Sequence, residues 1–203
     1  MTTRLALAMA LSLGLAAPAF ADAAPSTSAT QAANPFFAES TLPLHYPAFD
    51  KIADSDFAPA FEAGMKQELE QVEAIANNKA PATFDNTIIA LENSGAIMDR
   101  AMTVFSALAG ADTNDTRKAL QTQYATKFAA HRDAIGLNGK LFARIAALYE
   151  TRTALGLDAE GVRLIERYYE NFERGGAKLS EADKAKVRAI NSELAELGAK
   201  FNL

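Results

Sequence analysis

Few side chains in this sequence have the types and spacing that metal or nucleophilic chemistry requires. Cysteine is absent, and the histidines are limited to His45 and His131. Neither histidine lies in H-E-x-x-H or E-x-x-H, so the ligand patterns of zinc hydrolases and of di-iron helical bundles are both missing. The motifs G-x-S-x-G, G-x-x-x-x-G-K-[ST] and G-x-G-x-x-G are missing too. The sequence therefore predicts no catalytic, cofactor-binding or metal-ligating residue in this chain.

Other side chains have binding chemistry, but a structural role explains them better. His131 recurs on an apolar helical face, where it could carry a proton or bind one metal ion. We expect it instead to pack at a helix contact and to hydrogen-bond to a neighbour. His45 lies between two prolines and could contact a substrate, although surface or docking placement is the stronger interpretation. Tyr168 and Tyr169 could line a peptide groove, but we expect Tyr169 in the core and Tyr168 at its edge.

The charged side chains predict solvated helix faces rather than catalytic or phosphate sites. An acidic cluster with neighbouring arginines, and a basic group interleaved with acids, both have the near-helical spacing of salt-bridged surfaces. The first consists of Glu166, Glu170, Glu173, Arg163, Arg167 and Arg174, and the second of Lys184, Lys186, Arg188, Glu181 and Asp183. The formal net charge of -5 and the lack of a purely basic cluster argue against a nucleic-acid partner.

The first 21 residues predict a secretory signal peptide. Arg4 precedes an apolar run from Leu5 to Leu15, and Ala19-Phe20-Ala21 supplies a cleavage site. The run is shorter than the ~20 residues that span a bilayer, which disfavours the alternatives of a membrane anchor or a buried helix. Cleavage would leave a periplasmic or secreted product that begins near Asp22 and makes no membrane contact. Because the chain has no cysteine, stability in an oxidising compartment must come from packing.

The rest of the chain divides by composition. Residues 22–33 are small and polar, which predicts a flexible spacer. Residues 34–54 contain three prolines, which forbid a continuous helix and predict an extended arm that docks on a helical core. Residues 55–203 show apolar side chains at helical spacing and no sustained alternating pattern. We predict an all-α fold with about six mostly antiparallel helices joined by short turns.

Apolar stripes predict four helices in the first part of this region. The first begins near Ser55 or Asp56, and Pro59 falls in its first turn, where a missing N–H is harmless. The second starts near Thr83 to Asp85 and is kinked at Ser94-Gly95, since glycine costs a helix interior about 1 kcal/mol. The first three stripes are Phe61, Met65, Leu69, Val72 and Ile75; Ile88, Leu91, Met98, Met102, Phe105 and Leu108; and Leu120, Tyr124, Phe128, His131 and Ile135. The fourth helix is opened by Asn138, and its stripe is Leu141, Ile145 and Leu148, with Leu155 as a further candidate.

The segment from Leu155 to Phe201 is predicted to be a helical hairpin. Asp158 could cap its first helix and Gly175-Gly176 could end it, while Ser180-Glu-Ala-Asp183 has the spacing of a capping box for the second. The two stripes are Val162, Ile165, Tyr169 and Phe172, and Val187, Ile190, Leu194, Leu197 and Phe201. The second stripe has no stop signal, so we expect a truncated helix and an exposed apolar patch larger than a few hundred Å².

An ordered set of short segments resembles the thimet oligopeptidase family of zinc metallopeptidases. These segments are Asn34-Pro-Phe-Phe37, Ser40-Thr-Leu-Pro43, Pro47–Ile52, Phe57–Met65, Glu73–Asn78, Thr83–Glu92, Ala130–Ile135, Leu164–Tyr169 and Gly176–Asp183. The resemblance extends over residues 34–203. Within the family, the signal peptide, the proline-rich start and Asn77-Asn78 are most similar to the bacterial peptidyl-dipeptidase branch, with an oligopeptidase A-like endopeptidase as the alternative.

The resemblance implies a zinc peptidase that removes dipeptides from the C-terminus of short peptides inside a channel between two helical halves. In that family the zinc is held by the two histidines of H-E-x-x-H and a downstream glutamate, and the motif's own glutamate activates water. None of these residues is present here, so no catalytic or metal residue is carried over. The chain corresponds to the N-terminal channel wall, and we expect it to be inactive without the C-terminal catalytic region.

Two other functions stay open on sequence grounds. A free-standing helical module could have kept this region for binding peptides or a protein partner. A metal-storing helical bundle would need ligands that the chain does not contain.

Overall fold

The computed structural model describes residues 34–201, and this part of the chain is all-α, as predicted. It contains six helices of at least 13 residues and no strand. The helices are α2 (Asp54–Ala76), α4 (Ala96–Ala111), α5 (Asp115–Gly136), α6 (Gly139–Thr151), α7 (Ala159–Gly175) and α8 (Glu181–Phe201). None of the described helices combines the length and apolar character needed to span a membrane. The predicted signal peptide and spacer lie outside the described residues.

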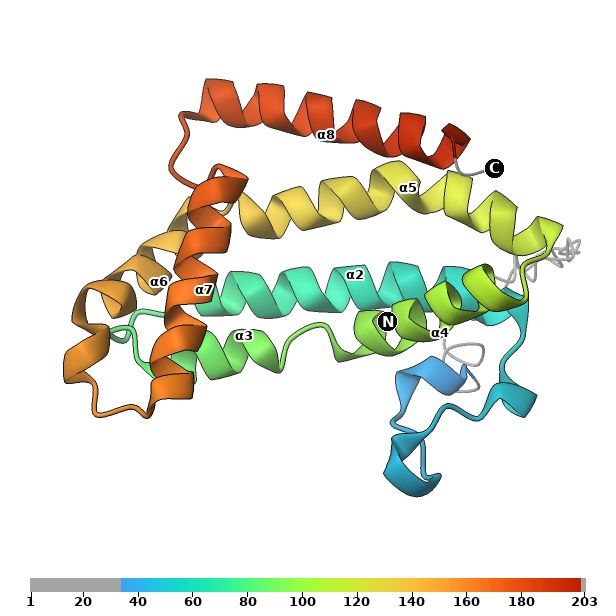
Figure 1. Cartoon of the computed structure of the whole chain (residues 1–203), viewed down its shortest axis with the longest axis horizontal. Coiled ribbons are helices and arrows are strands. Elements are labelled where there is room, and N and C mark those ends of the chain that lie inside the picture. Colours follow the sequence, from blue (N-terminus) through green and yellow to red (C-terminus); the bar gives the residue numbers. More distant parts are fainter. Residues whose placement is uncertain (1–33, 202–203) are drawn as a thin grey trace, which may run out of the picture.

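The helices are arranged around α2 (Figure 1). Helix α4 packs on one side of α2 and α5 on another, and α8 lies along the outer side of α5. Helices α6 and α7 pack together across one end of the molecule. A π-helical segment, Phe84–Ile89, runs directly into the short helix α3 (Ala90–Glu92). The π-helical segment contacts α6, and α3 contacts α2.

The buried apolar side chains form two clusters, one toward each end of α2. The first contains an aromatic group in which the Phe61 ring centroid lies 5.0 to 6.0 Å from those of its neighbours. Its rings belong to Phe57, Phe61, Phe105, Tyr124 and Phe128. The second cluster joins the C-terminal half of α2 to α6 and α7 through Val72, Ile75, Ile88, Leu141, Ile145, Leu148, Ile165 and Phe172. The polar middle of α2 therefore lies between two separate cores.

The arm is held to the helices near its start. Phe36 is buried against the ring of Phe57, with 5.3 Å between the ring centroids. Arg100 of α4 donates from Nε and Nη2 to the carbonyl of Phe36 at 3.0 and 2.9 Å. Short 3-10 turns interrupt the extended backbone, and one of them gives Leu44 and His45 positive φ values of 58° and 56°.

The helix starts follow the local signals, with one shift of position. Thr83 Oγ1 accepts from the Asn86 N–H at 3.1 Å, which confirms the predicted start of the second helical unit. Helix α2 starts at Asp54, slightly before the predicted Ser55 or Asp56, because the Asp56 carboxylate accepts from the backbone N–H of Ala53 at 2.8 Å. Pro59 consequently lies in the second turn rather than the first.

The second predicted helix is divided rather than kinked. Helix α3 ends at Glu92 and α4 begins at Ala96, and between them Gly95 has a φ of 73°. This left-handed conformation carries no Cβ penalty in glycine, so the chain turns completely out of the helical path.

The predicted hairpin is wrong in its packing. Asp158 caps α7 and Gly176 ends it with a φ of 100°, as the sequence indicates. Helix α7 packs on α6, however, whereas α8 departs from it and packs along α5 (Figure 1). The reason is that Ile165 and Phe172 of α7 find their apolar partners in the second cluster, so they need nothing from α8.

Close contact between α2 and α4 depends on Gly64. A Cβ atom at this position would lie 2.8 Å from the backbone nitrogen of Met98 and 2.9 Å from its Cα. Real Cβ atoms do not approach backbone atoms this closely, so any side chain would force the two helices apart.

We expect Gly64→Ala to lower the free energy of unfolding by about 1–3 kcal/mol, because overpacking outweighs the helix propensity of alanine. The matched control is Gly110→Ala in α4, where a Cβ would meet no atom within 4 Å. That variant should be neutral or slightly more stable. Urea unfolding of both variants measures the difference, and equal midpoints would contradict the role given to Gly64.

Candidate functional site

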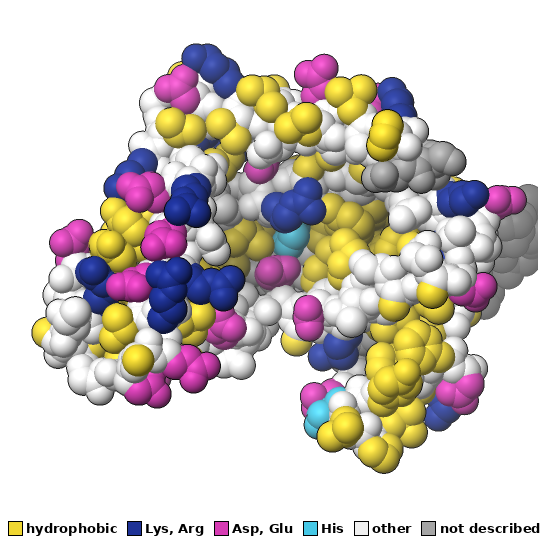
Figure 2. Space-filling model, viewed as in Figure 1, with side chains coloured by type: hydrophobic (Ala, Val, Ile, Leu, Met, Phe, Trp, Pro, Cys, Tyr) yellow, Lys and Arg dark blue, Asp and Glu magenta, His cyan; other side chains and the backbone are white. Residues whose placement is uncertain are grey.

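A cavity of about 650 Å³ opens between α2, α4, α5 and the connection from Glu92 to Gly95. Figure 2 shows a hollow in the middle of this face in which acidic, basic and apolar side chains meet. Its polar side chains include Glu68, Glu92, Asp99, His131 and Arg132. Its apolar wall includes Met98, Met102, Phe128 and Ile135. We refer to this space as the central cavity.

The best-defined interaction in the central cavity joins Glu68 of α2 to His131 of α5. The His131 Nε2 and Glu68 Oε2 atoms are 2.7 Å apart, and the side chains are 7% and 22% exposed respectively. A carboxylate only accepts, so Nε2 carries the hydrogen of this bond. The other ring nitrogen, Nδ1, is buried and has no hydrogen-bond partner among residues 34–201. This arrangement confirms that His131 packs at a helix contact and hydrogen-bonds to a neighbour.

Gly95 makes room for the Glu68 carboxylate. A Cβ atom at Gly95 would lie 2.7 Å from Glu68 Cδ and 2.9 Å from each carboxylate oxygen. The Gly95 N–H also donates to Gln71 Oε1 at 2.9 Å, which fixes the turn onto α2. The left-handed turn and the Glu68–His131 hydrogen bond therefore require the same glycine.

Tyr168 of α7 reaches the same region. Its hydroxyl donates to Glu92 Oε1 at 2.5 Å, and burial, reinforced by this carboxylate, raises the pKa of Tyr168 well above its usual value. Tyr169 is half-buried beside the second cluster rather than inside it, and its ring stacks on Tyr149 with centroids 3.9 Å apart. Tyr168 thus lies at the edge, as expected, while Tyr169 contributes to a surface stack.

The acidic cluster of α7 forms a salt-bridged surface, as predicted. Glu166 pairs with Arg152 and with Arg163, each at 3.1 Å, and its pKa is lowered chiefly by the hydrogen bond from Arg152. Glu173 pairs with Lys178 at 2.5 Å. The sequence reasoning missed Arg152 and Lys178 as partners because both lie outside α7.

Lys184 contradicts the predicted solvated face of α8. It is only 4% exposed, and its Nζ pairs with Glu181 Oε1 at 3.0 Å. The side chain is buried because α8 turns this face toward α5, where Asn191 also donates to Asp133 Oδ1 at 2.7 Å. Lys186, on the exposed side, pairs with Asp183 at 2.8 Å as a surface residue should.

His45 lies on the arm and is exposed, in agreement with surface placement. Its Nδ1 lies 3.0 Å from the carbonyl oxygen of Ser40. The two histidines therefore belong to different parts of the fold. Across residues 34–201, no three side chains of His, Cys, Asp or Glu come together in a way that could hold a metal ion.

Sequence reasoning did not single out Glu68, Glu92 or Asp99. A signal for Glu68 was available, because it lies three residues after Met65 and four before Val72, on the same face of α2, just as His131 lies on the apolar face of α5. A polar residue at a core-facing helical position indicates either a paired contact or a site.

We expect Gly95→Ala to break the Glu68–His131 contact. Alanine at a left-handed position costs about 1–2 kcal/mol, and an unpaired buried His131 N–H should cost about 1–3 kcal/mol more. Gly156→Ala is the control, since Gly156 has a φ of 70° and a Cβ there would meet nothing within 4 Å. NMR of the His131 Nε2 proton together with urea unfolding tests this. Equal losses in the two variants, with an unchanged His131 resonance, would refute it.

Comparison with known proteins gives two similar curated relatives. The chain is 45% identical over 169 residues to a dipeptidyl carboxypeptidase of Escherichia coli (strain K12), and 41% identical over 169 residues to that of Salmonella typhimurium (strain LT2). Each match covers 83% of this chain and 25% of the relative, so the chain spans about a quarter of the length of the relatives it matches. No protein-family model matches. Over the matched residues the chain is thus a homologue of the dipeptidyl carboxypeptidases, the peptidyl-dipeptidase type of the thimet oligopeptidase family.

Proposed function

We propose that this chain is the N-terminal, channel-wall region of an exported zinc metallopeptidase that releases C-terminal dipeptides from short peptides. The observation that carries the proposal is the 45% identity to a dipeptidyl carboxypeptidase over 169 residues. In such an enzyme the residues of this chain contact and position the peptide, and the bond-breaking groups are supplied by a catalytic region. Residues 1–21 would direct export to the periplasm or beyond, and N-terminal sequencing of the exported protein should begin near Asp22.

Residues 34–201 contain no cluster of side chains that could serve as the ligands of a catalytic zinc ion. A catalytic zinc needs three protein ligands drawn mainly from histidine, carboxylate and thiolate groups. The chain has two histidines and no cysteine, and residues 34–201 bring no three candidate ligands together. The proposal assigns the zinc to the catalytic region and no hydrolytic step to this chain.

The surface of α8 supports a role as part of a larger assembly. Four apolar side chains at helical spacing are exposed on it: Ile190 (55%), Leu194 (60%), Leu197 (54%) and Phe201 (90%). Figure 2 shows apolar side chains along this helix at the outer edge of the molecule. We call these four residues the α8 stripe. The proposed occupant of the stripe is the catalytic region, because the relatives have about three quarters of their length beyond the matched part.

The full chain alone should release no dipeptides in a chelator-sensitive reaction. When mixed with the remaining part of the Escherichia coli relative, it should form a one-to-one complex that does. The double variant Leu194→Glu/Leu197→Glu should weaken this complex at least about tenfold, since burying a leucine contributes about 1.5–3 kcal/mol. Sedimentation and peptide hydrolysis measure both effects.

The control is Ala189→Glu/Ser192→Glu, which adds the same charge at exposed positions of α8 outside the stripe. It should assemble normally. Chelator-sensitive hydrolysis by the chain alone would disprove the proposal. Self-association through the stripe that excludes the catalytic region, or equal assembly of the two double variants, would disprove the docking role.

A further inference from the structure

We propose that the central cavity binds the protonated amine of a peptide together with the apolar side chain next to it. The ligand class rests on the proposed function, which makes a peptide the molecule in contact with this region. The amine could be the peptide's N-terminus or a lysine side chain, and both share the chemistry of an ammonium donor on an aliphatic body.

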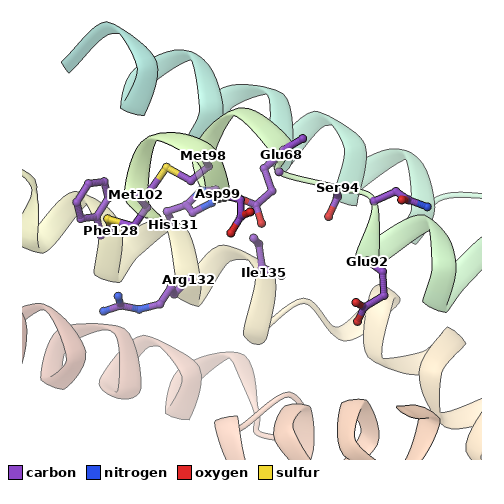
Figure 3. Close-up of a pocket in the computed structure, with 13 residues that line it drawn as sticks. Glu68, Glu92, Ser94, Met98, Asp99, Met102, Phe128, His131, Arg132 and Ile135 are labelled. Carbon is purple, nitrogen blue, oxygen red and sulfur yellow. Dashed lines mark hydrogen bonds and ion pairs between the residues drawn. The ribbon is translucent and has the colours of Figure 1, made fainter. Parts of the chain in front are cut away.

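The charge of the cavity favours a cation. Glu68, Glu92 and Asp99 enter it from three different elements, and within residues 34–201 none of these carboxylates has a lysine or arginine nitrogen within 4.0 Å. Figure 3 shows that the one basic side chain of the lining, Arg132, is directed away from Glu68 and Asp99. An ammonium group entering here would meet negative charge that no lysine or arginine of the described residues neutralises; Glu92 and Asp99 are exposed, and Glu68 is the most buried of the three.

Two of the carboxylates, Glu68 and Glu92, are also held in place with acceptor capacity left over. His131 occupies Oε2 of Glu68 and Tyr168 occupies Oε1 of Glu92, so each carboxylate keeps a second oxygen for a ligand. Asp99 accepts no side-chain hydrogen bond from residues 34–201 and points toward the same space as Glu68 (Figure 3). Pre-positioned acceptors lower the ordering cost that a ligand must offset.

The buried histidine sets this cavity apart from a surface cluster of acids. His131 is more than nine-tenths buried in the lining, and its Nδ1 has no hydrogen-bond partner within the described part of the chain. An imidazole buried only to stabilise the fold would be expected to have both nitrogens satisfied. The Glu68–His131 pair instead supports one carboxylate at the cavity wall, which is the arrangement of a binding site.

The apolar lining of the central cavity favours a ligand that carries an aliphatic group next to its amine. Met98, Met102, Phe128 and Ile135 line the same cavity as the carboxylates, and flexible methionine with aromatic side chains suits aliphatic groups of varied shape. The volume of about 650 Å³ lies within the range of small-ligand sites, about 300–1,000 Å³. A divalent metal ion fits less well, because no three potential ligands converge within the described residues.

The test uses the full chain and three small probes at low ionic strength, with calorimetry and NMR of the His131 ring as readouts. Leucine amide has a free α-amine, Nα-acetyllysine amide has only a side-chain amine, and N-acetylleucine amide has none. At least one amine probe should bind at least about tenfold more tightly than N-acetylleucine amide and shift the His131 resonances, as expected for a charge-assisted hydrogen bond. Preference for leucine amide or for the lysine probe identifies the source of the amine.

Asp99→Asn keeps the shape of the side chain and should weaken amine binding about tenfold or more. Glu70→Gln, on α2 but outside the cavity lining, is the control and should leave affinity unchanged. If Asp99→Asn fails to fold by circular dichroism, Glu92→Gln replaces it under the same criterion. Equal binding of all three probes, or equal affinity of the cavity variant and the control, would overturn the proposal. Because binding is measured without the catalytic region, failure here is distinguishable from failure of the proposed assembly.

Discussion

The close approach of α2 and α4 at Gly64 sets the geometry of the residues around it. Since a Cβ there would lie 2.8 Å from the backbone nitrogen of Met98, the two helices can sit at this distance only without a side chain. Glu68, one turn further along α2, and Asp99, next to Met98 on α4, then point into one space (Figure 3). Gly95 extends the same constraint to the turn before α4. The cavity is thus a consequence of two glycines that each remove a specific collision.

The central cavity also explains why the core is divided. The first cluster, at one end of α2, and the second cluster, at the other, are separated at the level of Glu68. Burying a carboxylate and an imidazole there costs desolvation energy that their mutual hydrogen bond only partly offsets. An apolar pair of similar volume would join the two clusters into one core. The polar gap therefore makes better sense as a place for a ligand than as a source of stability.

The fold class and most helix ends could be predicted from sequence because their signals are local. Thr83, Asn138 and Asp158 cap helices at the expected places, each through its own side chain. The packing of α7 and α8 could not, because a stripe shows that a helix needs a partner without showing which one. The cavity is equally non-local, since Glu68 and His131 meet across 63 positions of sequence. Only their position on helical faces that also carry apolar residues gave any indication of it.

Helix α8 shows how incomplete burial and function are related. The face it turns to α5 carries Lys184 and Asn191; Asn191 donates to Asp133 of α5, whereas Lys184 pairs with Glu181 of α8 itself. The docking of α8 on α5 therefore rests partly on a polar contact rather than on a continuous apolar surface. Such contacts contribute less than the burial of several large aliphatic side chains would. The apolar residues that could supply that burial lie on the neighbouring, exposed face of the same helix. Exposed apolar side chains do not stabilise the packing of α8. A protein surface that buried the α8 stripe, such as the proposed catalytic region, would therefore stabilise the position of α8 most.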